Sequence, residues 1–162
     1  MAKYECVDEM TIEATPSECF ESLIDEGAGR TAWWEPYVVI EPKGEIPAGQ
    51  PGAEMIHRAS PDGTTDRYWS TSRMTVRVAE IERDRRIVLT EEDGDFQGFE
   101  EWTFEPMDGD RTLIRVHWVA DPRGWMRLWS MFGGVVEDHS LIVREGLRGM
   151  ERHVAQRRRT RG

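Results

Sequence analysis

The segment 125–156 constrains the fold of this chain more than any other part. From residue 136 onward, apolar or small side chains recur at steps of three and four residues, which is the spacing of one face of a long amphipathic helix. Gly133 and Gly134 interrupt the chain before this pattern, so we expect the long helix to begin near them and a separate short helix over 125–132. The apolar face must be buried against a second layer of structure. That face consists of Val136, His139, Val143, Gly146, Met150 and Val154.

The second layer is predicted to be a β-sheet, because apolar and polar residues alternate along most of the chain before the helix. Short turns separate the alternating stretches, so successive strands should pair antiparallel. After the first strand, the tetrapeptide TPSE at 15–18 has the composition of a helix N-terminus. We expect two short helices there, over 16–25 and 31–34, the second ended by Pro36. The predicted strands are 3–13, 37–41, 53–59, 66–70, 73–82, 86–91, 99–106 and 111–120.

The last two predicted strands form a hairpin whose register can be proposed from the sequence. If residues 107–109 make a three-residue loop, Trp102 lies opposite Ile114 and Glu105 lies opposite Arg111. This register places apolar side chains together on one face and opposite charges together on the other.

The size and order of these elements indicate a single domain. A chain of 162 residues is one domain's worth. Strands preceded and followed by helices are typical of an α+β domain. We place the domain at 1–156 and expect a basic, disordered tail at 157–162. The last 22 residues hold 7 Lys+Arg and 2 Asp+Glu, although the formal charge of the whole chain is −10.

Charge and composition argue against several kinds of partner. A net charge of −10 repels phosphate backbones, so we expect no nucleic acid partner. We find no apolar run of about 18 residues and no leader, and therefore expect a cytoplasmic protein with no membrane span. Cys6 and Cys19 cannot form a disulfide framework. We expect a monomer or a homodimer, since an edge strand can pair with a second copy.

Several short motifs follow one another in an order that resembles a known superfamily. The chain resembles the START-like, Bet v 1-like (SRPBCC) superfamily and, within it, the polyketide cyclase/dehydrase group. The resemblance covers nearly the whole chain and implies a helix-grip fold, in which a curved antiparallel sheet wraps around the long C-terminal helix. It also implies a cavity between the sheet and that helix. The motifs are ATPSECF at 14–20, WWxP at 33–36, PGAEM at 51–55, RIVL at 86–89, FxxWxF at 99–104, TxI at 112–114 and LxxM at 147–150.

The inward faces of the strands and helices predict which residues would line this cavity. The chain has seven tryptophans and eight methionines, and such side chains suit a pocket for an apolar, ring-containing ligand. The alternative is that they only fill the core. The predicted ligand-binding residues are Trp33, Trp34, Met55, Tyr68, Met74, Trp102, Phe104, Ile114, Val116, Trp118, Trp129, Phe132, Val136 and Val143.

Two histidines are the candidate catalytic residues. His139 lies on the apolar stripe of the long helix and His57 on the inward face of its strand. Either imidazole could bond to a ligand oxygen or carry a proton, and either could instead be a core histidine bonded to a neighbour. Glu137 and Asp138 are expected to face solvent. The sequence contains no zinc-helix, Cys-x-x-Cys or dinucleotide-binding motif, so we expect no metal and no cofactor.

Three functions remain open at this point. The first is a non-catalytic binder of a hydrophobic small molecule, such as a lipid or a polyketide-like compound. The second is a polyketide cyclase or dehydratase-like enzyme, with His139 or His57 as proton carrier. The third is a protein-interaction module, like the chaperone-activating branch of the superfamily, which would require a large exposed apolar patch.

Overall fold

Seven antiparallel strands and one long helix dominate the computed structural model, which describes residues 3–162. Residues 1 and 2 of the expected domain lie outside this range. The strands form a single sheet in the order β1-β7-β6-β5-β4-β3-β2. Every neighbouring pair is antiparallel, as the short connections predicted. The strands are β1 (Tyr4–Ile12), β2 (Val38–Lys43), β3 (Glu54–Ala59), β4 (Ser72–Glu82), β5 (Arg86–Gly94), β6 (Phe96–Met107) and β7 (Arg111–Pro122).

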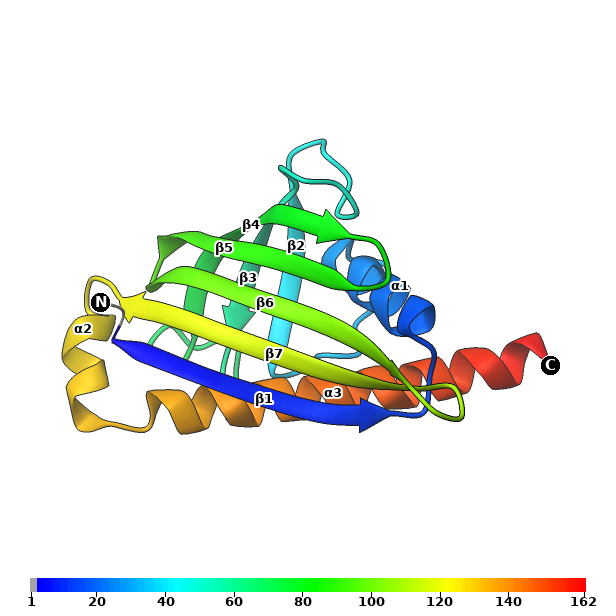
Figure 1. Cartoon of the computed structure of the whole chain (residues 1–162). Coiled ribbons are helices and arrows are strands. Elements are labelled where there is room, and N and C mark those ends of the chain that lie inside the picture. Colours follow the sequence, from blue (N-terminus) through cyan, green and yellow to red (C-terminus); the bar gives the residue numbers. More distant parts are fainter. Residues whose placement is uncertain (1–2) are drawn as a thin grey trace.

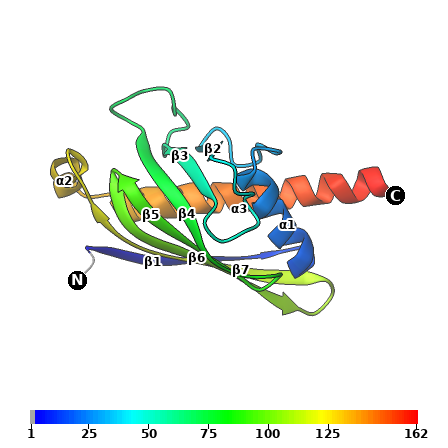
Figure 2. The same cartoon turned by 90° about the horizontal axis from the view of Figure 1, so that it is seen from above.

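The helices lie on one face of this sheet. Helix α3 (Val135–Arg161) runs along the sheet, and Figures 1 and 2 show the sheet curving around it. Helix α1 (Pro16–Gly27) packs on the same face, whereas α2 (Met126–Trp129) and the 3₁₀ turn η1 (Ser130–Phe132) lie at the far end. The α+β fold with a curved antiparallel sheet wrapped around a long C-terminal helix is therefore confirmed.

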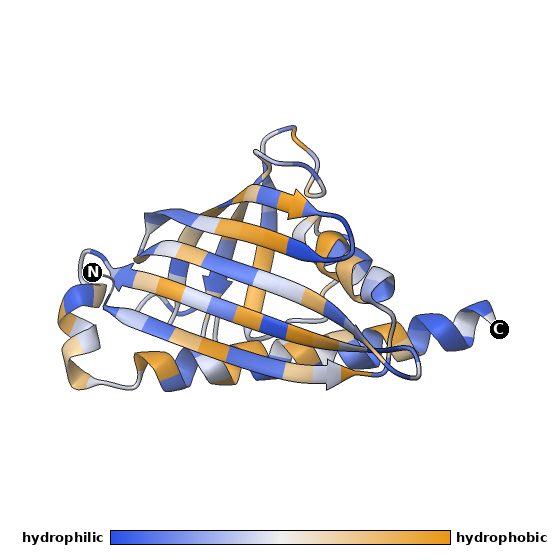
Figure 3. Cartoon of the chain, viewed as in Figure 1, coloured by the Kyte–Doolittle hydropathy of each residue, from blue (hydrophilic) through white to orange (hydrophobic). Residues whose placement is uncertain are grey.

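The pattern of side chains explains why the sheet has one buried face. Hydrophobic and hydrophilic residues alternate along the strands in Figure 3, and the buried apolar residues of β4 to β7 belong to one core cluster with those of α1 and α3. The β4–β5 ladder shifts register between Thr75 and Val76 and again between Val78 and Glu80. Such irregularities increase the local twist, and they help to bend the sheet around the helix.

Helix α1 begins as the sequence predicted. The hydroxyl of Thr15 accepts a hydrogen bond from the backbone N–H of Glu18, and the Glu18 carboxylate accepts one from the N–H of Thr15. This reciprocal capping satisfies two N–H groups that have no partner within the helix.

The second of the two expected short helices does not form. Residues 33–37 make turns instead. The buried Glu26 carboxylate accepts hydrogen bonds from the backbone N–H groups of Trp33 and Trp34, at 3.1 and 3.0 Å. These bonds anchor the segment to α1.

The strand predicted at 66–70 is also wrong, because residues 60–71 form a loop between β3 and β4. Asp62 organises this loop: its carboxylate accepts hydrogen bonds from the Ser60 hydroxyl at 2.6 Å and from the Thr64 backbone at 2.9 Å. Side-chain bonds of this kind offer the backbone an alternative to a strand ladder. Tyr68 and Trp69 consequently project from the loop and are exposed.

The β6–β7 hairpin has the predicted faces but a different register. Met107 pairs with Arg111, and Trp102 pairs with Val116 instead of Ile114. The three-residue loop is 108–110, one position later than expected, with Gly109 and Asp110 both at positive φ. A one-residue shift of the loop moves the register by two residues, which leaves every side chain on its predicted face.

The C-terminal residues differ from the expected disordered tail. Helix α3 continues to Arg161. The guanidinium of Arg157 lies 3.1 Å from Oδ2 of Asp25, and Nε of Arg158 lies 2.8 Å from Oε1 of Glu18. The basic end of α3 therefore packs against acidic residues of α1.

Candidate functional site

A cavity of about 520 Å³ lies between the sheet and the N-terminal part of α3. Helix α2 and the 60–71 loop complete its walls. Most of its lining is apolar or aromatic, with a few acidic and hydroxyl groups, which is the usual make-up of a small-molecule site. The lining residues are Ala59, Ser60, Pro61, Asp62, Trp69, Ser70, Ser72, Met74, Glu91, Phe96, Trp118, Trp125, Met126, Trp129, Gly133, Val135, Asp138, His139 and Ile142.

The rest of the space between sheet and helix is filled by side chains. Gly146 and Gly149 let Trp34 and the Trp33 backbone approach α3 so closely that a Cβ at either glycine would overlap them. The indole Nε1 of Trp34 donates to the carbonyl of Ile142 at 2.8 Å, and its ring packs edge-on against Trp102. The cavity is thereby confined to the end of the fold that carries α2.

Glu91 is the polar group of the cavity with an unused bonding position. Its Oε1 accepts a hydrogen bond from Nε1 of Trp118 at 3.0 Å, whereas its buried Oε2 has no hydrogen-bond partner. Burial, reinforced by the negative charge of Glu100, raises the pKa of Glu91 to about 7. The carboxyl is therefore poised to exist in both protonation states near neutral pH, and it can either donate to a ligand oxygen or accept from one.

His139 is held on both sides by protein groups. Its Nε2 lies 3.2 Å from Oε2 of Glu100 and its Nδ1 lies 3.5 Å from Sγ of Cys6. Its ring stacks on Trp118 with the centroids 4.0 Å apart. Burial disfavours the imidazolium, but the hydrogen bonds to Cys6 and Glu100 outweigh that cost and raise the pKa of His139 to about 9. Both nitrogens are thus engaged within the protein.

Glu100 links this histidine to the core. Its Oε1 accepts a hydrogen bond from Nε1 of Trp102 at 2.5 Å. Burial opposes ionisation of Glu100, yet the bond from His139 keeps its pKa below the usual range. Glu100 and His139 are therefore an internal ion pair at neutral pH.

His57 lies in a separate space of about 20 Å³ in the core, together with Trp34, Met55 and Trp102. Its Nε2 has no hydrogen-bond partner, and burial lowers the pKa of His57 to about 4. A neutral imidazole in so small a space does not reach a ligand in the larger cavity.

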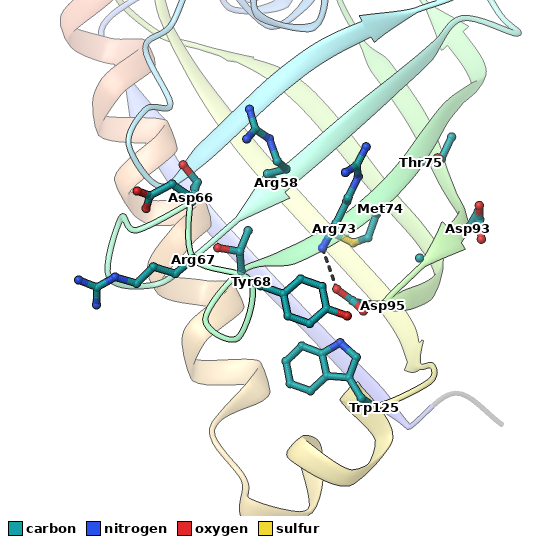
Figure 4. Close-up of a pocket in the computed structure, with 13 residues that line it drawn as sticks. Arg58, Asp66, Arg67, Tyr68, Arg73, Met74, Thr75, Asp93, Asp95 and Trp125 are labelled. Atoms are coloured by element: carbon teal, nitrogen blue, oxygen red, sulfur yellow. Dashed lines mark hydrogen bonds between the residues drawn. The ribbon is translucent and has the colours of Figure 1, made fainter.

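A polar groove of about 470 Å³ adjoins the cavity, and Met74 and Trp125 line both. Figure 4 shows the ring of Tyr68 next to that of Trp125, with Arg58 and Arg73 projecting from β3 and β4. The backbone N–H of Arg73 donates to Oδ2 of Asp95 at 2.8 Å.

Comparison with known proteins identifies the fold. No protein-family model matches the chain, and no curated protein is significantly similar to it in sequence. The structure is similar to that of the Zhui aromatase/cyclase from Streptomyces sp. R1128, with 18% identity over 98% of each chain and a TM-score of 0.73. It is also similar to a START superfamily protein from Mycobacterium smegmatis, with 15% identity over 94% of this chain and 97% of the other and a TM-score of 0.69. A third similar structure is Ara h 8.0201, a Bet v 1 allergen, with 18% identity over 94% and 98% of the two chains and a TM-score of 0.63.

The chain has the START-like, Bet v 1-like fold. Within this fold, none of the helices in residues 3–162 combines the length and apolar character needed to cross a membrane.

The START-like fold brings only part of the predicted site together. Met74, Trp118, Trp129 and His139 line the large cavity. Trp34, Met55, Trp102 and His57 line the small core space. The remaining predicted residues are placed elsewhere: Trp33, Phe104, Ile114, Val116 and Val143 are buried in the core, Tyr68 lines the outer groove, Phe132 is exposed and Val136 is half-buried.

At the N-terminal end of α3, the residues that line the cavity differ in part from those predicted. Val135, Asp138, His139 and Ile142 line the cavity, and their spacing is that of one helical face. Most of the predicted face is confirmed, because His139 lines the cavity and Val143, Gly146, Met150 and Val154 are buried. Only Val136 does not line the cavity, and Val135 does so instead. Asp138 is exposed to solvent, as expected, and it also lines the cavity; partial burial, reinforced by the charge of Glu137, raises its pKa.

The sequence reading missed Glu91 and Glu100. Glu91 has the same strand parity as the buried Ile87 and Leu89, and Glu100 has the parity of Trp102. An acidic residue on the inward face of a strand is costly to bury unless it has a task or a partner. That signal was present in the sequence and could have identified both residues.

Proposed function

We propose that this protein binds a hydrophobic, ring-containing small molecule in the cavity of about 520 Å³, with Glu91 as the polar anchor of the ligand. The observation that carries the proposal is the buried Oε2 of Glu91, which lacks a hydrogen-bond partner in the wall of a mostly apolar cavity. A ligand hydroxyl or carbonyl placed against this atom would supply the missing hydrogen bond. The flat ring of Trp129, which is 57% exposed, offers a stacking surface for an aromatic or polycyclic body.

The similar structures support the same class of ligand. One is described as an aromatase/cyclase and another as a START superfamily protein. We propose a lipid or polyketide-like compound on this basis, bound by a cytoplasmic protein.

The test is saturable binding of a defined aromatic probe, 2-naphthol, followed by the quenching of tryptophan fluorescence. Ala59 is the last residue of β3 and lines the cavity. Ala59→Trp should therefore fill the cavity and weaken binding at least tenfold. Ile56 lies on the opposite face of the same strand, and Ile56→Trp is the matched control that should bind as the wild type does. Equal affinities of the two variants would reject the cavity as the site.

A second candidate function is an aldol cyclase, and the pKa of Glu91, about 7, favours it. A general base works best when its pKa is near the operating pH. The Glu91 carboxylate would remove a proton from the carbon beside a ketone of the substrate. That carbon would then attack a second carbonyl of the same substrate molecule. The protonated carboxyl would then return its proton to the new alkoxide, which completes the addition.

The two functions differ in whether the wild type turns over a substrate and in whether Glu91→Gln abolishes that turnover. If Glu91 is a proton carrier, turnover of a poly-β-ketone substrate should be lost while affinity stays within about tenfold. If the protein only binds, the wild type should show saturable binding and no turnover. His139 is placed as a positioning residue, because Glu100 and Cys6 occupy its two nitrogens.

A further inference from the structure

A group of three potential metal ligands lies between β1 and α3, on the far side of His139 from Glu100. Cys6 and Asp8 project from the same face of β1, because residues two apart in a strand point the same way. His139 faces them from α3. One ligand atom from each of the three side chains lies within 4.8 Å of the other two.

The separation of two of these atoms matches tetrahedral zinc coordination. Zinc binds thiolate sulfur at about 2.3 Å and imidazole nitrogen at about 2.0 Å, so two such ligands at the tetrahedral angle lie about 3.5 Å apart. Sγ of Cys6 and Nδ1 of His139 are 3.5 Å apart. A carboxylate oxygen of Asp8 supplies a third ligand of a type that zinc accepts.

The neighbouring groups orient the three ligands. A metal-binding histidine commonly donates its other ring N–H to a carboxylate. Nε2 of His139 has such a partner in Oε2 of Glu100, at 3.2 Å. When zinc binds, Nδ1 of His139 releases its proton to solvent, and its lone pair is then directed toward the ion beside Cys6. The hydroxyl of Ser140 donates to Oδ2 of Asp8 at 2.8 Å, and Nε of Arg144 lies 3.4 Å from Oδ1.

We propose that Cys6, Asp8 and His139 form a zinc-binding site with a fourth position open to water or another ligand. Loss of the thiol proton makes the three side chains carry two negative charges, which neutralise Zn²⁺. The charges of Glu100 and Arg144 then offset each other. The partly exposed Cys6 gives the ion a route to a site whose other anionic ligand, Asp8, is buried.

The first test is titration of the whole, reduced, metal-free protein with Co²⁺. This ion binds in place of Zn²⁺, and its absorption spectrum depends on the ligands that hold it. We expect saturation at one equivalent, with a thiolate-to-cobalt charge-transfer band and intense visible bands of tetrahedral cobalt. Added Zn²⁺ should remove both stoichiometrically. Cobalt spectra without the thiolate band would overturn the proposal and leave Cys6 and His139 as a hydrogen-bonded pair.

Substitution of each cysteine identifies the ligand. Cys6→Ser should abolish the charge-transfer band, whereas Cys19→Ser should leave it unchanged, because Cys19 lies within α1, is fully buried and is not one of the three grouped ligands. Glu100→Gln should weaken Zn²⁺ binding roughly tenfold to a hundredfold through the orientation of His139. A band that survives Cys6→Ser, or that disappears in Cys19→Ser while that variant remains folded by circular dichroism, would contradict the assignment.

A measurement on the unaltered chain covers the case in which Cys6→Ser fails to fold. Alkylation by iodoacetamide, followed by mass spectrometry, should modify Cys6 faster than the buried Cys19. Stoichiometric Zn²⁺ should protect Cys6, and a chelator should restore its reactivity. Unchanged alkylation of Cys6 in the presence of Zn²⁺ would overturn the proposal.

Discussion

The indole Nε1 of Trp118 donates a hydrogen bond to Oε1 of Glu91 at 3.0 Å, while Oε2 of the same carboxyl has no partner. Trp118 also stacks on His139, whose Nε2 bonds Glu100. One side chain therefore positions both the free carboxyl and the internal ion pair. This arrangement makes Glu91 the group through which the protein would recognise a polar atom of its ligand.

The raised pKa of Glu91 predicts a specific dependence of stability on pH. The pKa of Glu91 is about 7 in the folded protein, against an ordinary value of 4.5. At a pH between these two values the carboxyl therefore takes up a proton when the protein folds. Its contribution to the free energy of unfolding is fully present below about 4.5 and is lost as the pH rises through 7. Glu91→Gln keeps an acceptor for Trp118 and removes this loss.

Urea denaturation between pH 5 and pH 8 measures the effect. Glu100, His139 and Asp138 also titrate around Glu91, so the informative quantity is the difference between Glu91→Gln and the wild type. We expect the variant to gain roughly 2 kcal/mol on the wild type as the pH rises. A difference that stays constant across this range would show that Glu91 ionises as a solvent-exposed carboxyl does.

Gly146 should be intolerant of alanine, against the usual trend for helices. Alanine at an exposed helical position is favoured over glycine by about 1 kcal/mol. At Gly146 the added methyl group would overlap the indole of Trp34, which is fixed by its bond to the Ile142 carbonyl. We expect Gly146→Ala to lower the free energy of unfolding by about 1–3 kcal/mol.

Chemical denaturation of Gly146→Ala beside Arg152→Ala provides the check. Arg152 is exposed on the same helix, and its substitution should change stability by less than about 0.5 kcal/mol. An increase in stability for Gly146→Ala would mean that Trp34 does not pack against α3.

The end of α3 should contribute to stability through Arg158. Its hydrogen bond to Glu18 is the main cause that lowers the pKa of that carboxyl to about 2. A carboxyl whose pKa is lower in the folded state stabilises the fold when the pH is above its ordinary pKa of 4.5. This contribution to the free energy of unfolding is lost as the pH falls toward 2. Both side chains are partly exposed, so we expect Arg158→Ala to cost about 1 kcal/mol or less at neutral pH.

Thermal unfolding at about pH 7 and about pH 3 tests this contact. The cost of Arg158→Ala should shrink at the lower pH, and Arg159→Ala, at the next and exposed position, should have little effect at either. Identical behaviour of the two variants at neutral pH would indicate that the C-terminal arginines are not docked on α1.

The sequence was sufficient for the fold because local and long-range signals agree. The alternation of strands, the capping residues at 15–18 and the helical spacing after Gly134 each predict a structure that forms. The strand predicted at 66–70 is wrong because hydrogen bonds donated to Asp62 hold a loop between β3 and β4, and a strand pattern of five residues carries no information about such bonds.

The cavity was harder to predict because it depends on which parts of the interface are filled. Alternation identifies inward-facing residues such as Phe104 and Val116, but not whether they meet a ligand or another side chain. The close approach of Trp34 to Gly146 decides that question, and it joins residues more than one hundred positions apart. Cys6 and His139 meet for the same reason, through the docking of α3 on β1.

The most direct test of the central claim is a comparison of two probes of nearly equal size, 2-naphthol and 2-methylnaphthalene, on the wild type and on Glu91→Leu. Their affinities can be measured by competition with a bound fluorescent naphthalene derivative. We predict that the wild type prefers the hydroxyl compound by roughly tenfold, or about 1.4 kcal/mol, and that Glu91→Leu loses this preference. The same preference in both proteins would contradict the assignment of Glu91 as the polar anchor of the cavity.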